Sequence, residues 1–116
     1  PLSAYNIFFR YERSRLIHLS KSGQSIHDHP PPNITRSDLL DFLEKNPSQT
    51  PQERKKRAHV KTHGVISFTD LNRIVSQNWN ALGDSTKAIF NQIAHELMVE
   101  HYRKIEEERK KARRLA

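Results

Sequence analysis

The sequence contains no cysteine and no long hydrophobic run. Without cysteine it can form neither a disulfide framework, nor a thiolate zinc site, nor a cysteine nucleophile, and it suits a reducing compartment. Its longest runs of aliphatic or aromatic residues have three members, so the sequence predicts neither a transmembrane helix nor the apolar core of a signal peptide. It also lacks a glycine-rich phosphate loop, which argues against a nucleotide-binding enzyme.

Hydrophobic residues are scarce as well. They make up 34% of the 116 residues, whereas 28% are charged; an ordinary domain has roughly 45–50% apolar residues when glycine is included. The length fits one domain with a small core. Candidate acids such as Asp38 and Asp41 sit on expected exposed faces with no apolar pocket around them, so we predict neither an enzyme nor a cofactor site.

The charge is strongly basic. Twenty Lys and Arg against thirteen Asp and Glu give a net charge of +7. Residues 1–17 carry +2, 18–63 carry +3, 64–99 carry −1 and 100–116 carry +3, so the basic surface lies at the start, in the middle and in the tail. This balance favours a polyanionic partner, and nucleic acid is the leading one.

Apolar residues recur at helical spacing in three main stretches, and no stretch shows the alternation of a strand. The first begins at Ser3 and is so apolar that either two of its faces are buried or one is kept for a ligand. The second opens at Ser67, three residues before Asp70 in a capping-box spacing, and Gly83 is its natural stop.

The third stretch is the longest. Asp84 or Ser85 is its expected cap, and its apolar line continues to Ile105, beyond which the helix should leave the core and project. The aromatic residues on the inner faces of the three helices are expected core residues, with Trp79 as their hub. They are Phe8, Trp79, Phe90 and Tyr102.

Residues 18–63 form a polar stretch rich in proline and histidine, inside which two short helices are predicted. Ser37 can cap the first, which carries the apolar stripe Leu39–Leu43. Thr50 can cap the second, which opens the basic run Arg54–Arg57. That run can contact phosphate, act as an import signal or dock an acidic partner, and the sequence does not choose among these.

A metal site is the other interpretation of this stretch, because His59 and His63 stand four residues apart. Without cysteines or a constrained scaffold, we predict a polar insertion and no metal. The histidines concerned are His18, His27, His29, His59 and His63.

The opening PLSAYNIFFR, the later SFTDLNRIVSQNWNALGDSTKAIF and a long final helix with a basic tail resemble the HMG box, over residues 1–17 and 64–112. The resemblance implies an all-α, three-helix L-shaped domain that holds its concave face to the DNA minor groove, inserts apolar side chains between base steps and bends the duplex. Within one domain, 1–116, we assign 1–17 to helix 1, 18–63 to an insertion, 64–83 to helix 2 and 84–116 to helix 3 and the tail. The insertion adds about forty residues, which a surface loop tolerates because closure entropy grows only logarithmically.

The resemblance also implies a set of DNA-contacting residues. The first intercalating position of the family is Asn6 here, and the second, eleven residues before Trp79, is Phe68, which we predict to be the working wedge. Ser3 stands where non-specific boxes usually carry Ser and sequence-specific ones Asn, which implies weak base discrimination. Further positions on the concave face are Tyr5, Arg10, Arg13, Thr69, Asn72, Arg73 and Ser76.

Acidic and basic residues alternate in the tail. Glu106 to Lys110 and Glu107 to Lys111 have the spacing of helix-stabilising pairs. We expect the last cations to neutralise phosphates or to serve nuclear import. They are Lys110, Lys111, Arg113 and Arg114.

The sequence therefore predicts a module that binds and bends double-stranded or distorted DNA with little sequence preference, in chromatin or transcription regulation. Its expected location is the nucleus, with the mitochondrion left open, and the chain is expected to be an excerpt of a longer protein. One alternative is a sequence-preferring transcription factor that reads bases through Asn6. Another is a protein-interaction scaffold, in which the stripe Leu39–Leu43 is exposed and docks a chromatin or transcription protein.

Overall fold

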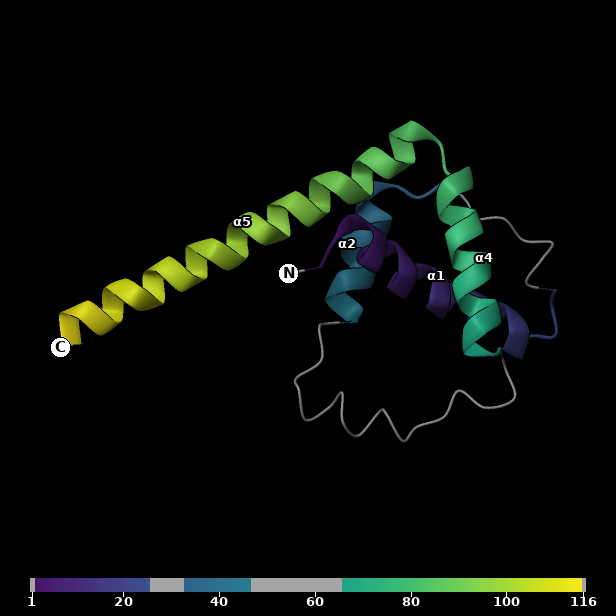
Figure 1. Ribbon diagram of the computed structural model, residues 1–116, viewed down its shortest axis with the longest axis horizontal. Coiled ribbons are helices and arrows are strands. Elements are labelled where there is room, and N and C mark those ends of the chain that lie inside the picture. Colours follow the sequence, from purple (N-terminus) through teal and green to yellow (C-terminus); the bar gives the residue numbers. More distant parts are fainter. Residues whose placement is uncertain (1, 26–32, 47–65, 116) are drawn as a thin grey trace.

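The computed structural model describes residues 2–25, 33–46 and 66–115. These ranges contain four helices and no strand: α1 (Ala4–Lys21), α2 (Arg36–Lys45), α4 (Phe68–Ala81) and α5 (Asp84–Leu115) (Figure 1). The all-α fold class is thereby confirmed. None of the helices in these ranges combines the length and the apolar character needed to cross a membrane.

Helix α1 begins and ends at well-defined caps. The Ser3 hydroxyl accepts a hydrogen bond from the Asn6 backbone N–H at 3.2 Å. At the other end Gly23 has a φ of 78°, a left-handed conformation that favours glycine, and the following Gln24 N–H donates to the Leu19 carbonyl at 3.0 Å. The helix therefore runs past residue 17, where the sequence placed the start of the insertion.

Helix α2 lies in that insertion, but the expected cap was wrong. Thr35, not Ser37, is the N-cap: its hydroxyl accepts from the Asp38 N–H at 3.1 Å, and the Asp38 carboxylate accepts from the Thr35 N–H at 3.2 Å. This reciprocal capping box places Ser37 inside the first turn. The second predicted helix, from Thr50, lies outside the described residues.

The junction between α4 and α5 matches the sequence in part. Ser67 caps α4 as predicted, since its hydroxyl accepts from the Asp70 N–H at 3.2 Å. Helix α4 ends at Ala81, just before Gly83. However, the Gly83 carbonyl accepts from the Lys87 N–H at 3.0 Å, so Gly83 occupies the cap position of α5, and the expectation of Asp84 or Ser85 as the cap was wrong.

The core lies where α1, α4 and α5 meet. The Trp79 ring centroid is 5.2 Å from that of Phe8, 5.9 Å from that of Tyr5 and 6.0 Å from that of Phe90, which confirms Trp79 as a hub. The buried apolar residues are Ile7, Phe8, Leu16, Ile34, Leu39, Leu71, Ile74, Val75, Phe90 and Ile93.

Helix α1 packs against three other helices over one wide side, which explains its apolar sequence. Phe8 faces α4 and α5, whereas Tyr11 packs edge-on against Phe42 of α2, with ring centroids 5.3 Å apart. Burial raises the pKa of the Tyr11 hydroxyl, and the nearby Asp38 carboxylate raises it further.

Helix α5 leaves the core earlier than its apolar line predicts. Ile93 is its last buried residue, about three turns before Ile105. Tyr102 is 60% exposed, so its assignment to the core was wrong. The reason is the length of its neighbours: α1 and α4 cover only the first turns of α5, and the rest of the helix extends away from them (Figure 1).

Candidate nucleic-acid interface

Four of the predicted contact residues share one face of α4. Thr69, Asn72, Arg73 and Ser76 follow one another at spacings of three, one and three residues, which places them on adjacent turns of one side of the helix. None of the four is buried. This stripe borders the line of core residues that holds α4 against α1.

Helix α1 carries a second polar stripe. Asn6, Arg10 and Arg13 are spaced by four and three residues and so share one face as well. Asn6 is exposed, and the two arginines are half-buried. We call the two stripes together the polar face.

Tyr5 and Ser76 join these stripes. The Tyr5 hydroxyl lies 3.0 Å from Oγ of Ser76, a hydrogen bond between α1 and α4 in which either oxygen can be the donor. Tyr5 also packs edge-on against Trp79. The sequence predicted both residues for the same site, and the structure brings them into direct contact.

A buried carboxylate lies at the same helix interface. Glu12 is fully buried and accepts two hydrogen bonds from the Arg15 guanidinium, at 2.6 and 2.8 Å, and one from the Asn78 side-chain amide at 2.9 Å. Sequence reasoning missed this network. The available signal was the position of Glu12 four residues after Phe8 and four before Leu16, on the buried side of α1.

Phe68 is the first residue of α4 and is 73% exposed. It is next to Thr69 in sequence, so it stands at one end of the polar face. This exposure shows that Phe68 is not a core residue. A large aromatic side chain left in solvent at a helix end has the form that intercalation requires.

Ser3 and Asn6 lie at the start of α1. The Ser3 hydroxyl accepts from the Asn6 N–H and so is engaged in capping the helix, while its own O–H remains a donor. The side chain of Asn6 is exposed on the polar face. Both residues are therefore at the end of α1 that carries Tyr5.

Part of the positive charge of the polar face is already engaged. The Arg10 guanidinium donates to the Asn46 carbonyl at 2.6 Å, and the Arg73 guanidinium pairs with Asp70 at 3.0 Å. Arg73 makes one ion pair through a guanidinium that has five N–H donors. The pairing with Asp70 is solvent-exposed and thus weak, and a phosphate can compete with it.

The tail cations do not belong to the polar face. Lys110, Lys111, Arg113 and Arg114 are exposed at the far end of α5, away from α1 and α4 (Figure 1). Within the described residues no acidic partner lies within 4.0 Å of them, so the predicted pairs of Lys110 with Glu106 and of Lys111 with Glu107 are not formed.

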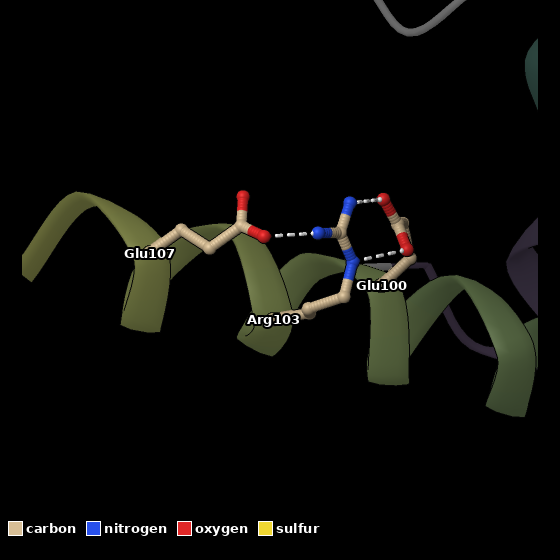
Figure 2. Close-up of polar contacts among 3 residues, drawn as sticks. All are labelled: Glu100, Arg103 and Glu107. Carbon is tan, nitrogen blue, oxygen red and sulfur yellow. Dashed lines mark hydrogen bonds and ion pairs between the residues drawn. The ribbon is translucent and has the colours of Figure 1, made fainter. Parts of the chain in front are cut away.

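Arg103, and not one of those lysines, forms the ion pairs with glutamates in this part of α5. It donates to both oxygens of Glu100 on the preceding turn and to Glu107 on the following one (Figure 2). The guanidinium lowers the pKa of the Glu100 carboxyl through these hydrogen bonds. Because two carboxylates surround the single Arg103 guanidinium, the stretch from Glu100 to Glu107 is locally acidic. The cations without an acidic partner in the described part of the chain follow it, from Lys110 onward.

No metal centre is visible among the described residues, which contain no group of three possible ligands. Of the five histidines weighed for such a site, His18 lies near the end of α1. The other four lie outside the described residues, as does the basic run Arg54–Arg57.

Comparison with protein-family models, curated proteins and solved structures gives no match to this chain. The resemblance to the HMG box therefore depends on the residue patterns of the sequence alone.

Proposed function

We propose that this chain is a DNA-binding module of the HMG-box type that binds the minor groove and bends DNA with little sequence preference. The exposed Phe68 at one end of the polar face carries the proposal. Burying a phenylalanine side chain contributes roughly 1.5–3 kcal/mol of favourable free energy, which the free protein does not gain because Phe68 is exposed. Insertion between base steps recovers it and offsets the cost of unstacking, a few kcal/mol per step.

The arrangement of the helices supports an L-shaped box. Helices α1 and α4 pack together through Trp79 and Glu12, and α5 departs at an angle after a two-residue connection (Figure 1). In this proposal α1 and α4 form the short arm, and α5 forms the long one. Its wedge and contact residues then lie on the short arm.

The composition of the polar face supports weak base discrimination. Thr69, Asn72 and Ser76 offer small hydrogen-bonding groups that fit the degenerate pattern of the minor groove, and Arg10 and Arg13 supply phosphate contacts. Such a module acts by binding and not by catalysis. Its place is with DNA, in the nucleus or, as the alternative, the mitochondrion.

The tail of α5 carries positive charge far from the core of the domain. Arg109 lies sixteen residues beyond Ile93, about 24 Å along the helix axis, or about seven base pairs of duplex. In the proposed complex the cations after Arg109 contact phosphates outside the bent step. They strengthen binding in a salt-dependent manner without reading sequence.

Helix α2 does not cover the polar face. Tyr11, which packs against α2, is five residues from Asn6 and two from Arg13, so both polar residues point about 140–160° away from it around α1. By this spacing α2 packs on the side of α1 that faces away from Asn6 and Arg13. Asn46, just after α2, nevertheless contacts the polar face, because its carbonyl accepts from Arg10.

A binding titration against a linear duplex and a four-way junction of matched composition, at two salt concentrations, tests the proposal. Phe68→Ala should remove the preference for the junction. Val99→Ala, which trims a 53% exposed apolar residue of α5, is the matched control and should leave it unchanged. Absence of salt-dependent binding to either DNA would overturn the proposal.

One alternative keeps DNA as the partner. Asn6 is exposed on the polar face, where its amide can reach base edges, and this favours a sequence-preferring transcription factor as the second candidate. Base-substitution scanning separates the two, because specific readout costs roughly 1–3 kcal/mol for each wrong base pair.

The scaffold alternative loses its main support. It required an exposed apolar stripe on the inserted helix, but Leu39 is fully buried and Phe42 and Leu43 pack against the core. Of that stripe only Leu40 is largely exposed. The described part of the insertion is thus a packed structural element.

A further inference from the structure

Helix α2 contacts both arms of the domain. Its apolar side inserts Leu39 into the same buried cluster as Ile7 of α1 and Ile93 of α5. Ile34, just before the helix, belongs to that cluster too. An inserted segment that served only as a surface loop would not contribute fully buried residues to the core.

A polar contact fixes α2 to α5. The Arg36 guanidinium donates two parallel hydrogen bonds to the Glu96 carboxylate, at 2.6 and 2.7 Å. A bidentate pair of this kind constrains orientation as well as distance. Glu96 lies three residues beyond Ile93, where α5 begins to leave the core, so the pair holds α5 at the start of its unsupported section.

Two contacts fix α2 to α1. Phe42 packs edge-on against Tyr11, and the carbonyl of Asn46, at the C-terminal end of α2, accepts from the Arg10 guanidinium at 2.6 Å. A cation at this end of a helix also interacts favourably with the helix dipole. Each end of α2 is thereby attached to a different arm, with Arg36 at its first residue and Asn46 just after its last.

We propose that α2 is a brace that sets the direction of α5 relative to α1 and α4, with Arg36 as the positioning residue of the α2–α5 contact. The consequence for DNA depends on the proposed function: an angle set before binding lowers the cost of ordering the two arms on a bent duplex. The brace itself is a property of the free protein and does not depend on DNA.

Distance measurements on the free protein test the brace. The chain has no cysteine, so spin labels at Gln77→Cys on α4 and Glu108→Cys on α5, both exposed positions, report the angle between the arms. Arg36→Ala should broaden or shift the distance distribution, whereas the exchanged pair Arg36→Glu with Glu96→Arg should restore it. Lys45→Ala, which breaks the Lys45–Asp41 pair within α2, is the control and should leave the distribution unchanged.

An unchanged distribution in Arg36→Ala would overturn the brace, provided that circular dichroism shows the variant folded. If that variant unfolds, the exchanged pair decides: a folded protein with the native distribution supports the brace, and any other result overturns it.

DNA binding gives a second measurement. Arg36→Ala should weaken binding to the four-way junction about two- to fivefold, the range expected of one exposed ion pair, and the exchanged pair should recover the affinity. If the wild-type chain binds no DNA, the proposed function fails while the label distances still judge the brace. If affinity falls with no change in the distances, the brace is wrong and Arg36 acts on DNA directly.

Discussion

The amide Nδ2 of Asn78 donates a hydrogen bond of 2.9 Å to the carboxylate of Glu12, which is fully buried between α1 and α4. The Arg15 guanidinium donates to both carboxylate oxygens as well. No buried side-chain polar atom in the described part of the chain lacks a hydrogen-bond partner. A fully partnered carboxylate fixes how α1 lies against α4. The polar face depends on that relation, because half of it comes from each helix.

We therefore predict that Asn78→Ala lowers the free energy of unfolding by about 1.5–3 kcal/mol, the usual worth of a hydrogen bond to a charged group. Urea unfolding followed by circular dichroism measures this. Asn80→Ala, at an exposed position two residues further along α4, is the control. A change in Asn78→Ala no larger than that of the control would show that Arg15 alone satisfies the carboxylate.

Burial of Tyr11 predicts a dependence of stability on alkaline pH. Its pKa is raised above the ordinary value of 10.0, chiefly by desolvation under α2. Above pH 10 the unfolded chain releases this proton and the folded chain retains it, so the unfolded state binds fewer protons and stability falls as the pH rises. Stability below pH 10 is unaffected by this group.

Ultraviolet titration of tyrosine checks that prediction. The titration should contain a late step above the ordinary pKa of 10.0, and Tyr11→Phe should remove that step. If the late step persists in Tyr11→Phe, the buried phenol is not Tyr11, and the packing of α2 on α1 is incorrect.

The helix signals of the sequence were correct where the deciding contact is local. Ser67 and Asp70 are three residues apart, and the cap they predict is present. The wrong cap expected for α2 was also a local matter and was avoidable. Three residues after Thr35 comes Asp38, which can complete a capping box, whereas three after Ser37 comes Leu40, which cannot.

Contacts between residues far apart in the chain could not be predicted from the sequence. Periodicity marks Tyr102 as lying on the apolar side of α5 but does not show that its neighbours end several turns earlier. Likewise the buried Glu12 accepts from Asn78, 66 positions away, as well as from the nearby Arg15. The residues of the polar face were predicted as a set, but the Tyr5–Ser76 contact that joins them required the packing of α1 on α4.

The tail predicts a measurable salt dependence. Replacing Lys110, Lys111, Arg113 and Arg114 together by alanine should reduce the slope of log affinity against log salt by about 0.9 for each phosphate that is no longer neutralised. Titrations of one duplex at several salt concentrations give that slope. Lys45→Ala, which removes a single cation of α2 that is not a member of the polar face, should leave it unchanged. An unaltered slope in the fourfold variant would show that the tail does not touch the DNA.

Phe68 of α4 and Phe90 of α5 should separate binding from folding. Phe90 is fully buried against Phe8 and Trp79, so Phe90→Ala should cost about 3–5 kcal/mol of stability. Phe68 is exposed, so Phe68→Ala should change stability by less than about 0.5 kcal/mol while it abolishes the preference for a four-way junction. Denaturant unfolding and junction titration of both variants measure the two effects. A loss of stability in Phe68→Ala comparable to that of Phe90→Ala would mean that Phe68 is a packing residue, and the wedge would have to be sought at Asn6.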